Sequence, residues 1–208
     1  MPMRGTRIGG WGEQGWTLLE LIVVVAILGV VSALAITPTV GAMRALRVGT
    51  DRRALVTTVA LARMRAAAGF TRARVYAELD GRRFRLQVWR KTGGGAWVTE
   101  GGDVFLSTSV NFGFGAMAEA PANTQAALGQ APACRVGLNA AGAAIANTAC
   151  IVFNSRSIPI DAAGAPSGEG AFWVNNGVEV HGATVSATGL AQSWSAPLLG
   201  ANPTWTKR

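Results

Sequence analysis

The stretch that decides the fold is WTLLELIVVVAILGVVSALAI, residues 16–36. Leucine, valine, isoleucine and alanine dominate it, and Glu20 is its single charged residue. As an α-helix its 21 residues would span roughly 31 Å, about the thickness of the hydrocarbon core of a bilayer. The sequence therefore predicts a helix that is apolar on all sides and long enough to cross a membrane.

Basic residues flank this stretch on both sides. Residues 1–15, MPMRGTRIGGWGEQG, are polar and rich in glycine. Arg4 and Arg7 favour a cytoplasmic N-terminus under the positive-inside rule. Arginines also follow the stretch, so charge alone does not fix its orientation: Arg44, Arg47, Arg52 and Arg53.

Glu20 is the anomaly, because a carboxylate inside an apolar span is costly and usually functional. It follows Trp16 by four residues. A cut between Gly15 and Trp16 would create an α-amino group one helical turn from Glu20. The two opposite charges would then neutralise each other, within one subunit or between neighbours.

Residues 15–31, GWTLLELIVVVAILGVV, resemble the prepilin N-terminal motif: a glycine, a hydrophobic residue, a glutamate at the fifth mature position and a long apolar run. The resemblance implies that prepilin peptidase removes residues 1–15 as a leader and methylates the new N-terminus at Trp16. Tryptophan stands where the family usually has phenylalanine. It also implies that Glu20 sets the axial register of a filament.

Two other interpretations of the apolar stretch stay open. Ser32-Ala33-Leu34-Ala35 resembles the end of a secretory signal peptide, and cleavage after Ala35 would release a soluble periplasmic binding protein. Against this, the apolar run exceeds the usual 7–15 residues of such a signal, and it contains an acidic residue. The other alternative is a plain single-span anchor.

Helical patterning continues beyond the apolar stretch. Apolar residues recur at near-helical spacing, with arginines on the other faces: Leu46, Leu55, Val59, Ala62 and Ala66. We expect one helix from about residue 16 to residue 68, kinked near Pro38, loosened at Gly49 and stopped by Gly69. Residues 16–37 would form the membrane and assembly segment, and residues 38–69 an amphipathic continuation.

The remainder, 70–208, reads as a β-rich periplasmic domain. Residues 73–90 form a strong hairpin signal with Asp80-Gly81 at the turn, and Arg83, Arg85 and Gln87 share one face. Further strands are expected at AWVTE, VFLSTSV, CIVFN, AFWVNN and VEVHGATVSAT, whereas residues 113–148 are weakly patterned. The predicted fold class is α+β: a long N-terminal helix packed on an antiparallel sheet domain, as in pilins.

The two cysteines, Cys134 and Cys150, fit one disulfide in an oxidising compartment. Two buried free thiols are the alternative. No cysteine and histidine cluster has zinc spacing, so no metal site is predicted. His181, the single histidine, is more often structural than a catalytic base in such a strand pattern.

Basic residues gather in the first half of the chain, with 13 basic and 3 acidic residues between Arg44 and Lys91. Such a surface attracts the phosphates of lipid or nucleic acid, or is simply solvated. With Trp89 as a stacking platform, a DNA-binding patch is one hypothesis. It would comprise Arg72, Arg74, Arg82, Arg83, Arg85, Trp89 and Arg90.

CIVFNSRSIPIDAAGAPSG and the strand ending in Thr188-Gly189 resemble the GspH/FimT group of pseudopilins and minor pilins. The resemblance implies a structural subunit of a type IV pilus or a type II secretion pseudopilus, with other pilins and prepilin peptidase as partners. Its location would be the inner membrane, single-pass, and then the filament. Some members are thought to bind DNA, which is the alternative function. No catalytic motif, cofactor or small-molecule substrate is predicted.

Overall fold

The computed structural model describes residues 16–125, 127–138, 142–199 and 204–208, without the side chains of residues 34–40. In this part of the chain one α-helix, α1 (Leu18–Ala68), precedes ten β-strands. The predicted α+β class is confirmed. The chain divides into two compact units, Met1–Ala42 and Met43–Arg208. The kink predicted near Pro38 falls within 34–40, which the structure describes as helix without side chains.

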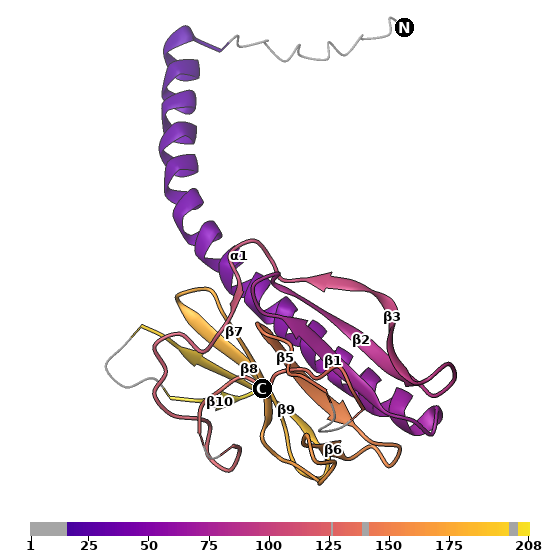
Figure 1. Ribbon diagram of the computed structural model, residues 1–208. Coiled ribbons are helices and arrows are strands. Elements are labelled where there is room, and N and C mark those ends of the chain that lie inside the picture. The colour runs from indigo at the N-terminus through magenta and orange to yellow at the C-terminus, as the bar shows by residue number, and fades with distance from the viewer. Residues whose placement is uncertain (1–15, 126, 139–141, 200–203) are drawn as a thin grey trace, which may run out of the picture. The chain divides into compact units, whose positions relative to one another are not determined.

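The strands of the second unit form two antiparallel sheets (Figure 1). The order in the first sheet is β3 (Ala96–Phe105), β2 (Arg83–Arg90), β1 (Ala73–Glu78), β5 (Thr148–Phe153) and β6 (Pro159–Ile160). The order in the second sheet is β10 (Thr206–Lys207), β9 (Ala191–Pro197), β8 (Glu179–Val185), β7 (Gly170–Asn175) and β4 (Asn111–Phe112).

The second half of α1 carries the apolar stripe that builds the main core. Its fully buried residues are Val48, Leu55, Val59, Ala62 and Ala66. The prediction that Leu46 begins this stripe is wrong, because Leu46 is 66% exposed. Val48 precedes Leu55 by two full helical turns and shares its face, whereas Leu46 precedes it by two and a half turns and points the opposite way.

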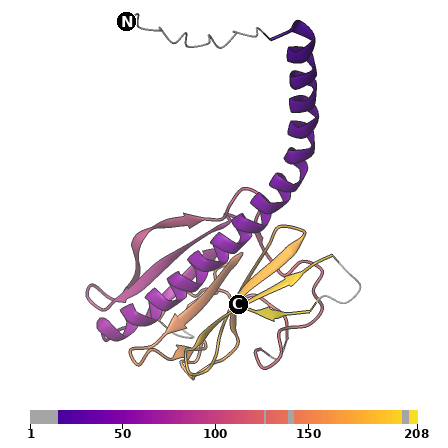
Figure 2. The ribbon, with the colours of Figure 1, turned by 180° about the vertical axis from the view of Figure 1, so that it is seen from behind.

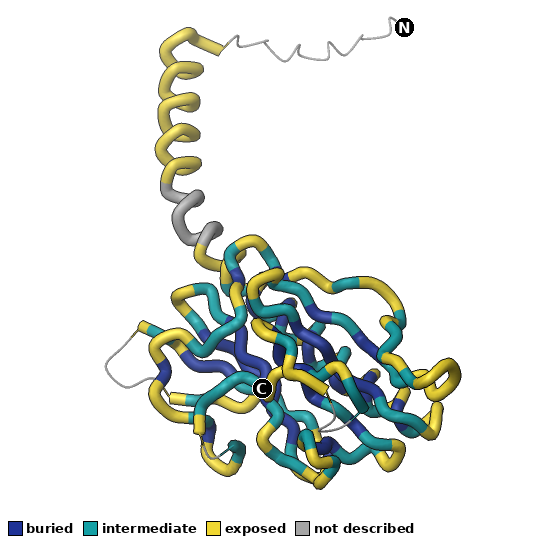
Figure 3. Tube along the Cα trace, viewed as in Figure 1, coloured by how far each residue is buried: buried dark blue, intermediate teal, exposed yellow. Residues whose placement is uncertain are grey.

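This stripe contacts side chains from both sheets. Val75 of β1 and Phe153 of β5 reach it from the first sheet, and Phe172 of β7 reaches it from the second. The views from the front and from behind both show this part of α1 running alongside β1, β2 and β5 (Figures 1 and 2). Buried positions concentrate along these central elements, and loops are largely exposed (Figure 3). One helical stripe therefore ties the two sheets into a common core.

A smaller core covers the other face of the second sheet. The fully buried ring of Trp173 packs there with residues of the irregular segment after β4, including Phe114, Met117 and Leu128. The Gln130 side chain accepts the Trp173 backbone N–H at 2.9 Å and donates to the Trp173 carbonyl at 2.8 Å. One side chain thus pairs this backbone as a neighbouring strand would.

The predicted hairpin is confirmed, with β1 and β2 paired antiparallel from Ala73↔Val88 to Glu78↔Arg83. Its turn differs from the expected one. Four residues connect the strands, and Arg82, not Gly81, adopts the left-handed conformation, with φ 47°. The two strands expected at 96–110 are also wrong in their bounds. Gly101 and Gly102 lie inside a single strand, β3, and the chain leaves the sheet after Phe105.

The end of α1 is closed by a Schellman motif, and its left-handed position is held by Phe70 instead of Gly69. The Thr71 N–H donates to the Ala66 carbonyl at 3.1 Å, and the Phe70 N–H donates to the Ala67 carbonyl at 3.1 Å. Phe70 has φ 45° and is 78% exposed. A side chain at this position costs energy that glycine would avoid.

Phe70→Gly is therefore expected to stabilise the folded unit by about 1 kcal/mol, since relief of the left-handed strain exceeds the added entropy of the unfolded chain. Phe105→Gly is the matched control, because Phe105 is an exposed aromatic residue at the end of β3. That change should destabilise the chain, as glycine does in a strand. Urea unfolding of the full chain in a non-ionic detergent measures both effects. Loss of stability in Phe70→Gly would contradict the strain argument.

Candidate functional site

The first described residues form the start of α1. Gly15, the residue before the predicted cut, lies outside the described residues, and Trp16 is 68% exposed. Thr17 caps the helix, because its hydroxyl accepts the Glu20 N–H at 3.3 Å and its carbonyl accepts the Leu21 N–H at 3.2 Å. Glu20 therefore stands in the first turn, where a carboxylate is favoured by the helix dipole. Thr-x-x-Glu is a capping pattern that is visible in the sequence, and it marks this helix start.

Every side chain from residue 16 to residue 33 is exposed. Most are large and apolar, including Leu18, Ile22, Ile27 and Val31. Among the side chains that the structure describes, no helix combines the length and the hydropathy of a membrane span. The side chains of residues 34–37, at the end of the predicted segment 16–37, are not described.

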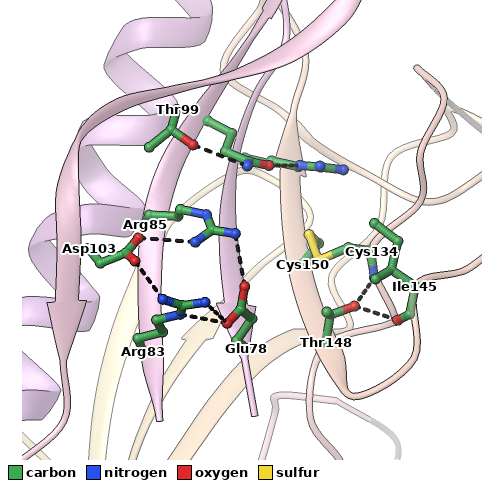
Figure 4. Close-up of polar contacts among 11 residues, drawn as sticks. Glu78, Arg83, Arg85, Thr99, Asp103, Cys134, Ile145, Thr148 and Cys150 are labelled. Carbon is green, nitrogen blue, oxygen red and sulfur yellow. Dashed lines mark hydrogen bonds and ion pairs between the residues drawn. A yellow bond between two sulfur atoms is a disulfide. The ribbon is translucent and has the colours of Figure 1, made fainter. Parts of the chain in front are cut away.

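Three of the arginines in the predicted basic patch are held by other parts of the first sheet. Arg83 pairs with Glu78 at 2.5 Å and with Asp103 at 3.1 Å. Arg85 pairs with the same two carboxylates, at 2.9 and 3.1 Å. Figure 4 shows the four side chains closing a square across β1, β2 and β3. Hydrogen bonding from Arg83 is the main cause that lowers the pKa of Glu78.

Arg74, the third, lies beside this square and is only 3% exposed. Its Nε donates to Gln87 Oε1 at 2.8 Å, and its Nη1 donates to the Arg135 carbonyl at 2.7 Å. Its guanidinium carbon lies 4.1 Å from the centre of the Trp97 ring and 5.2 Å from that of Tyr76. A phosphate backbone on the protein surface would not reach this cation.

The remaining members of the patch are spread over both ends of the hairpin. Arg82, at the turn, donates to the Thr108 carbonyl at 2.7 Å. Arg72, Trp89 and Arg90 lie at the opposite end, where the Trp89 ring meets Trp97 edge to face. The structure therefore does not bring the seven predicted residues together as one open surface, and it gives DNA capture less support than the sequence did.

Cys134 and Cys150 are joined by a disulfide, with their Cα atoms 4.9 Å apart (Figure 4). The bond attaches the segment around Cys134 to Cys150 of β5, on the outer face of the first sheet. Nearby hydrogen bonds strengthen this attachment: Thr148 Oγ1 accepts the Cys134 N–H at 3.1 Å and donates to the Ile145 carbonyl at 2.6 Å. The Arg135 carbonyl that receives Arg74 is held in place by this attachment.

His181 belongs to a group of charged residues that the sequence did not bring together. Its Nε2 lies 3.1 Å from Glu179, and its Nδ1 is buried without a partner among the described residues. Burial is the main cause that lowers the pKa of His181, and the charges of Arg52 and Arg208 act in the same direction. Contact with Glu179 acts in the opposite direction. In the part of the chain that the structure describes, no group of three acidic, cysteine or histidine side chains could hold a metal ion.

The lowered pKa predicts a loss of stability in acid. Between pH 7.5 and 5.5 the unfolded chain binds a proton at His181 near pH 6.5, and the folded chain resists it. Stability present above pH 6.5 is then lost as the pH falls, by at most about 1.4 kcal/mol per pH unit. Because His181 is the only histidine, His181→Gln should flatten the fall in melting temperature. Equal falls in both proteins would contradict the assignment.

Comparison with known proteins gives one weak likeness. No family profile matches the sequence, and no curated protein matches it. A solved structure similar to this chain is that of the minor pseudopilin EpsH from the Type 2 Secretion System of Vibrio cholerae, with 10% sequence identity and a TM-score of 0.35. The match covers 78% of this chain and 96% of that chain. At this TM-score it carries no argument, so the role of this chain is inferred from its own residues.

Proposed function

We propose that the chain is a structural subunit of a filament assembled from the inner membrane: a minor pilin or pseudopilin. Residues 16–37 anchor the subunit in the membrane before assembly, with the folded unit in the periplasm. In the filament the same residues pack against the helices of neighbouring subunits. The role is structural, without catalysis or a cofactor.

The observation that carries this proposal is the unpaired apolar surface of α1. From residue 16 to residue 33 every described side chain is exposed, and no side is polar enough to face water as a stable surface. Exposed apolar patches larger than a few hundred Å² mark membrane or protein contacts. A helix that is apolar all round requires lipid or other helices on every side, and a filament subunit uses both in turn.

Glu20 gives the proposal its specificity. In lipid or in a bundle of helices its carboxylate needs a positive partner. Cleavage after Gly15 would supply one, as the α-amino group of Trp16 on the same subunit or on a neighbour. A pairing between neighbours fixes the axial offset of one helix against the next, because Glu20 is the single charged side chain of the stretch and the apolar residues that follow it permit sliding.

The unit Met43–Arg208 supports the same role from the other end of α1. The apolar stripe of α1 from Val48 to Ala66 is part of the main core of this unit. Within this unit, the second half of α1 is therefore packed into the folded core from Val48 to Ala66. The resemblance of residues 150–189 to the GspH/FimT group favours a minor component of a type IV pilus or of a type II secretion pseudopilus.

The first test is the mature N-terminus. Co-expression with prepilin peptidase should yield a chain that begins with N-methylated Trp16, seen by mass spectrometry of the intact protein. Gly15→Leu should abolish this product, whereas Gly12→Leu, a glycine change within the leader, should not. A chain that begins at Ile36 would indicate signal peptidase and a soluble product. An uncut chain would indicate a plain anchor, and either result would refute the filament role.

The second test concerns Glu20. Glu20→Gln should be processed normally but should enter filaments at least about tenfold less, because breaking a buried ion pair costs about 3–5 kcal/mol. Glu119→Gln, which changes an exposed carboxylate in a loop, is the control. The amount of subunit in sheared filaments, relative to the amount in membranes, measures incorporation. Equal incorporation of Glu20→Gln and the control would remove the assigned role of this carboxylate.

A further inference from the structure

Arg74 is a buried cation for which the described chain provides no counter-ion. It points outward from β1, yet the segment around the disulfide covers it, and its residual exposure is 3%. The hydrogen-bond acceptors that hold it, Gln87 Oε1 and the Arg135 carbonyl, are neutral. No carboxylate among the described residues lies within ion-pair distance of it. A buried charge is normally paired, so this one requires an explanation.

The neighbouring arginines show that this is not a property of the whole sheet face. Arg83 and Arg85 stand on the adjacent strand with more exposed side chains than Arg74, and both are paired with Glu78 and Asp103. The chain therefore provides carboxylates for the two more exposed arginines. Among the described residues it provides none for Arg74, which is only 3% exposed.

A cavity of about 150 Å³ opens beside Arg74. Trp97, Ile160 and the Cys134–Cys150 disulfide supply apolar walls, and Arg135 is a second cation on its lining. A space of this volume holds a molecule about as large as benzene. It is therefore wide enough for a small organic acid or for one amino-acid side chain, and too small for a nucleotide.

The charges that face this cavity favour an anion. Burial lowers the pKa of Arg74 to about 10, with the charge of Arg85 acting in the same direction and Tyr76 acting against it. Asp161 is the carboxylate on the cavity lining, but its Oδ1 already accepts the N–H groups of Ala163 and Ala165 at 2.9 Å each. Its turn thus holds it in place, and it does not neutralise Arg74.

We infer that this cavity is a binding site for a carboxylate group, which pairs with the guanidinium of Arg74 while its short carbon chain lies against Trp97 and Ile160. Two of the five N–H donors of Arg74 have partners, one on Nε and one on Nη1, so Nη2 and the second hydrogen of Nη1 remain for a ligand. A carboxylate can accept hydrogen bonds from both with its two oxygens, and its single charge balances that of Arg74. The group belongs either to a free organic acid or to an acidic side chain of another protein.

The test compares propionate with propionamide, which has the same shape without the charge. The full chain, in a non-ionic detergent at constant ionic strength, is melted in the presence of each. Propionate at ten times its Kd should raise the melting temperature by about 3 to 6 °C, and propionamide should leave it unchanged. An equal shift with propionate and propionamide would overturn the inference.

Variants test whether the rise in melting temperature with propionate comes from binding in the cavity beside Arg74. Arg74→Gln should abolish the shift, whereas Arg83→Gln, which removes a paired arginine from the same sheet face, should retain it. If Arg74→Gln does not fold, Ala144→Trp provides a second test, because Ala144 is exposed and lines the cavity. Filling the cavity there should also abolish the shift without touching Arg74. A shift that survives in Ala144→Trp would place the binding elsewhere and refute the site.

A second pair of ligands separates the two sources of the carboxylate. N-acetyl-glutamate methylamide presents the side-chain carboxylate of a protein, and the corresponding glutamine derivative is its neutral control. Stabilisation by the glutamate compound assigns the cavity to an acidic side chain of a partner protein. Stabilisation by propionate alone assigns it to a free acid. Either result supports the carboxylate site, and failure of both refutes it.

Discussion

The structure depends on one shared surface: the stripe of small and branched side chains on the second half of α1. Valine, leucine and alanine at intervals of three, four and seven residues form its buried face. Phe153 from one sheet and Phe172 from the other belong to the same buried cluster. Because both sheets use the same stripe, neither can shift on the helix without disturbing the other. The register of the strands that contribute to this core, β1, β2, β5, β7 and β8, is therefore constrained by the stripe.

The outer faces of the two sheets differ in chemistry: one is apolar and covered, and the other is polar. In the second sheet the irregular segment after β4 covers Trp173. The Gln130 side chain forms hydrogen bonds with the Trp173 backbone that a neighbouring strand would otherwise form. The first sheet leaves its outer face polar and orders it by cross-strand ion pairs between arginines and carboxylates. Arg74 stands where the disulfide-fastened segment meets this polar face, which is why it is buried and still lacks an ion-pair partner among the described residues.

Features that follow from the spacing of apolar residues could be predicted from the sequence. Contacts between residues far apart in the chain could not. The α+β class and the β1–β2 hairpin follow from patterns of 3.6 and 2 residues. Leu46 was assigned to the wrong helix face because several residues fit an approximate spacing, and only the packing on the sheets selects Val48. The chain gave no local sign that Arg83 and Arg85 meet Asp103, since strand register decides that contact. Strand β9 was not predicted because its sequence, AQSWSAP, shows little alternation of apolar and polar residues.

The edges of the two sheets have a consequence for how this chain meets others. Within the described residues three edge strands, β4, β6 and β10, contain two residues each, too short to template a strand from another molecule. The fourth edge, β3, is long, but Gly101 twists it at φ 81° and a register shift interrupts its ladder with β2. The regular part of this edge is thereby limited to residues 96–100 on one side of the irregularity. Among the described strands, little of the sheet edge can therefore template a strand from another copy of the molecule, which disfavours strand exchange in a crowded population.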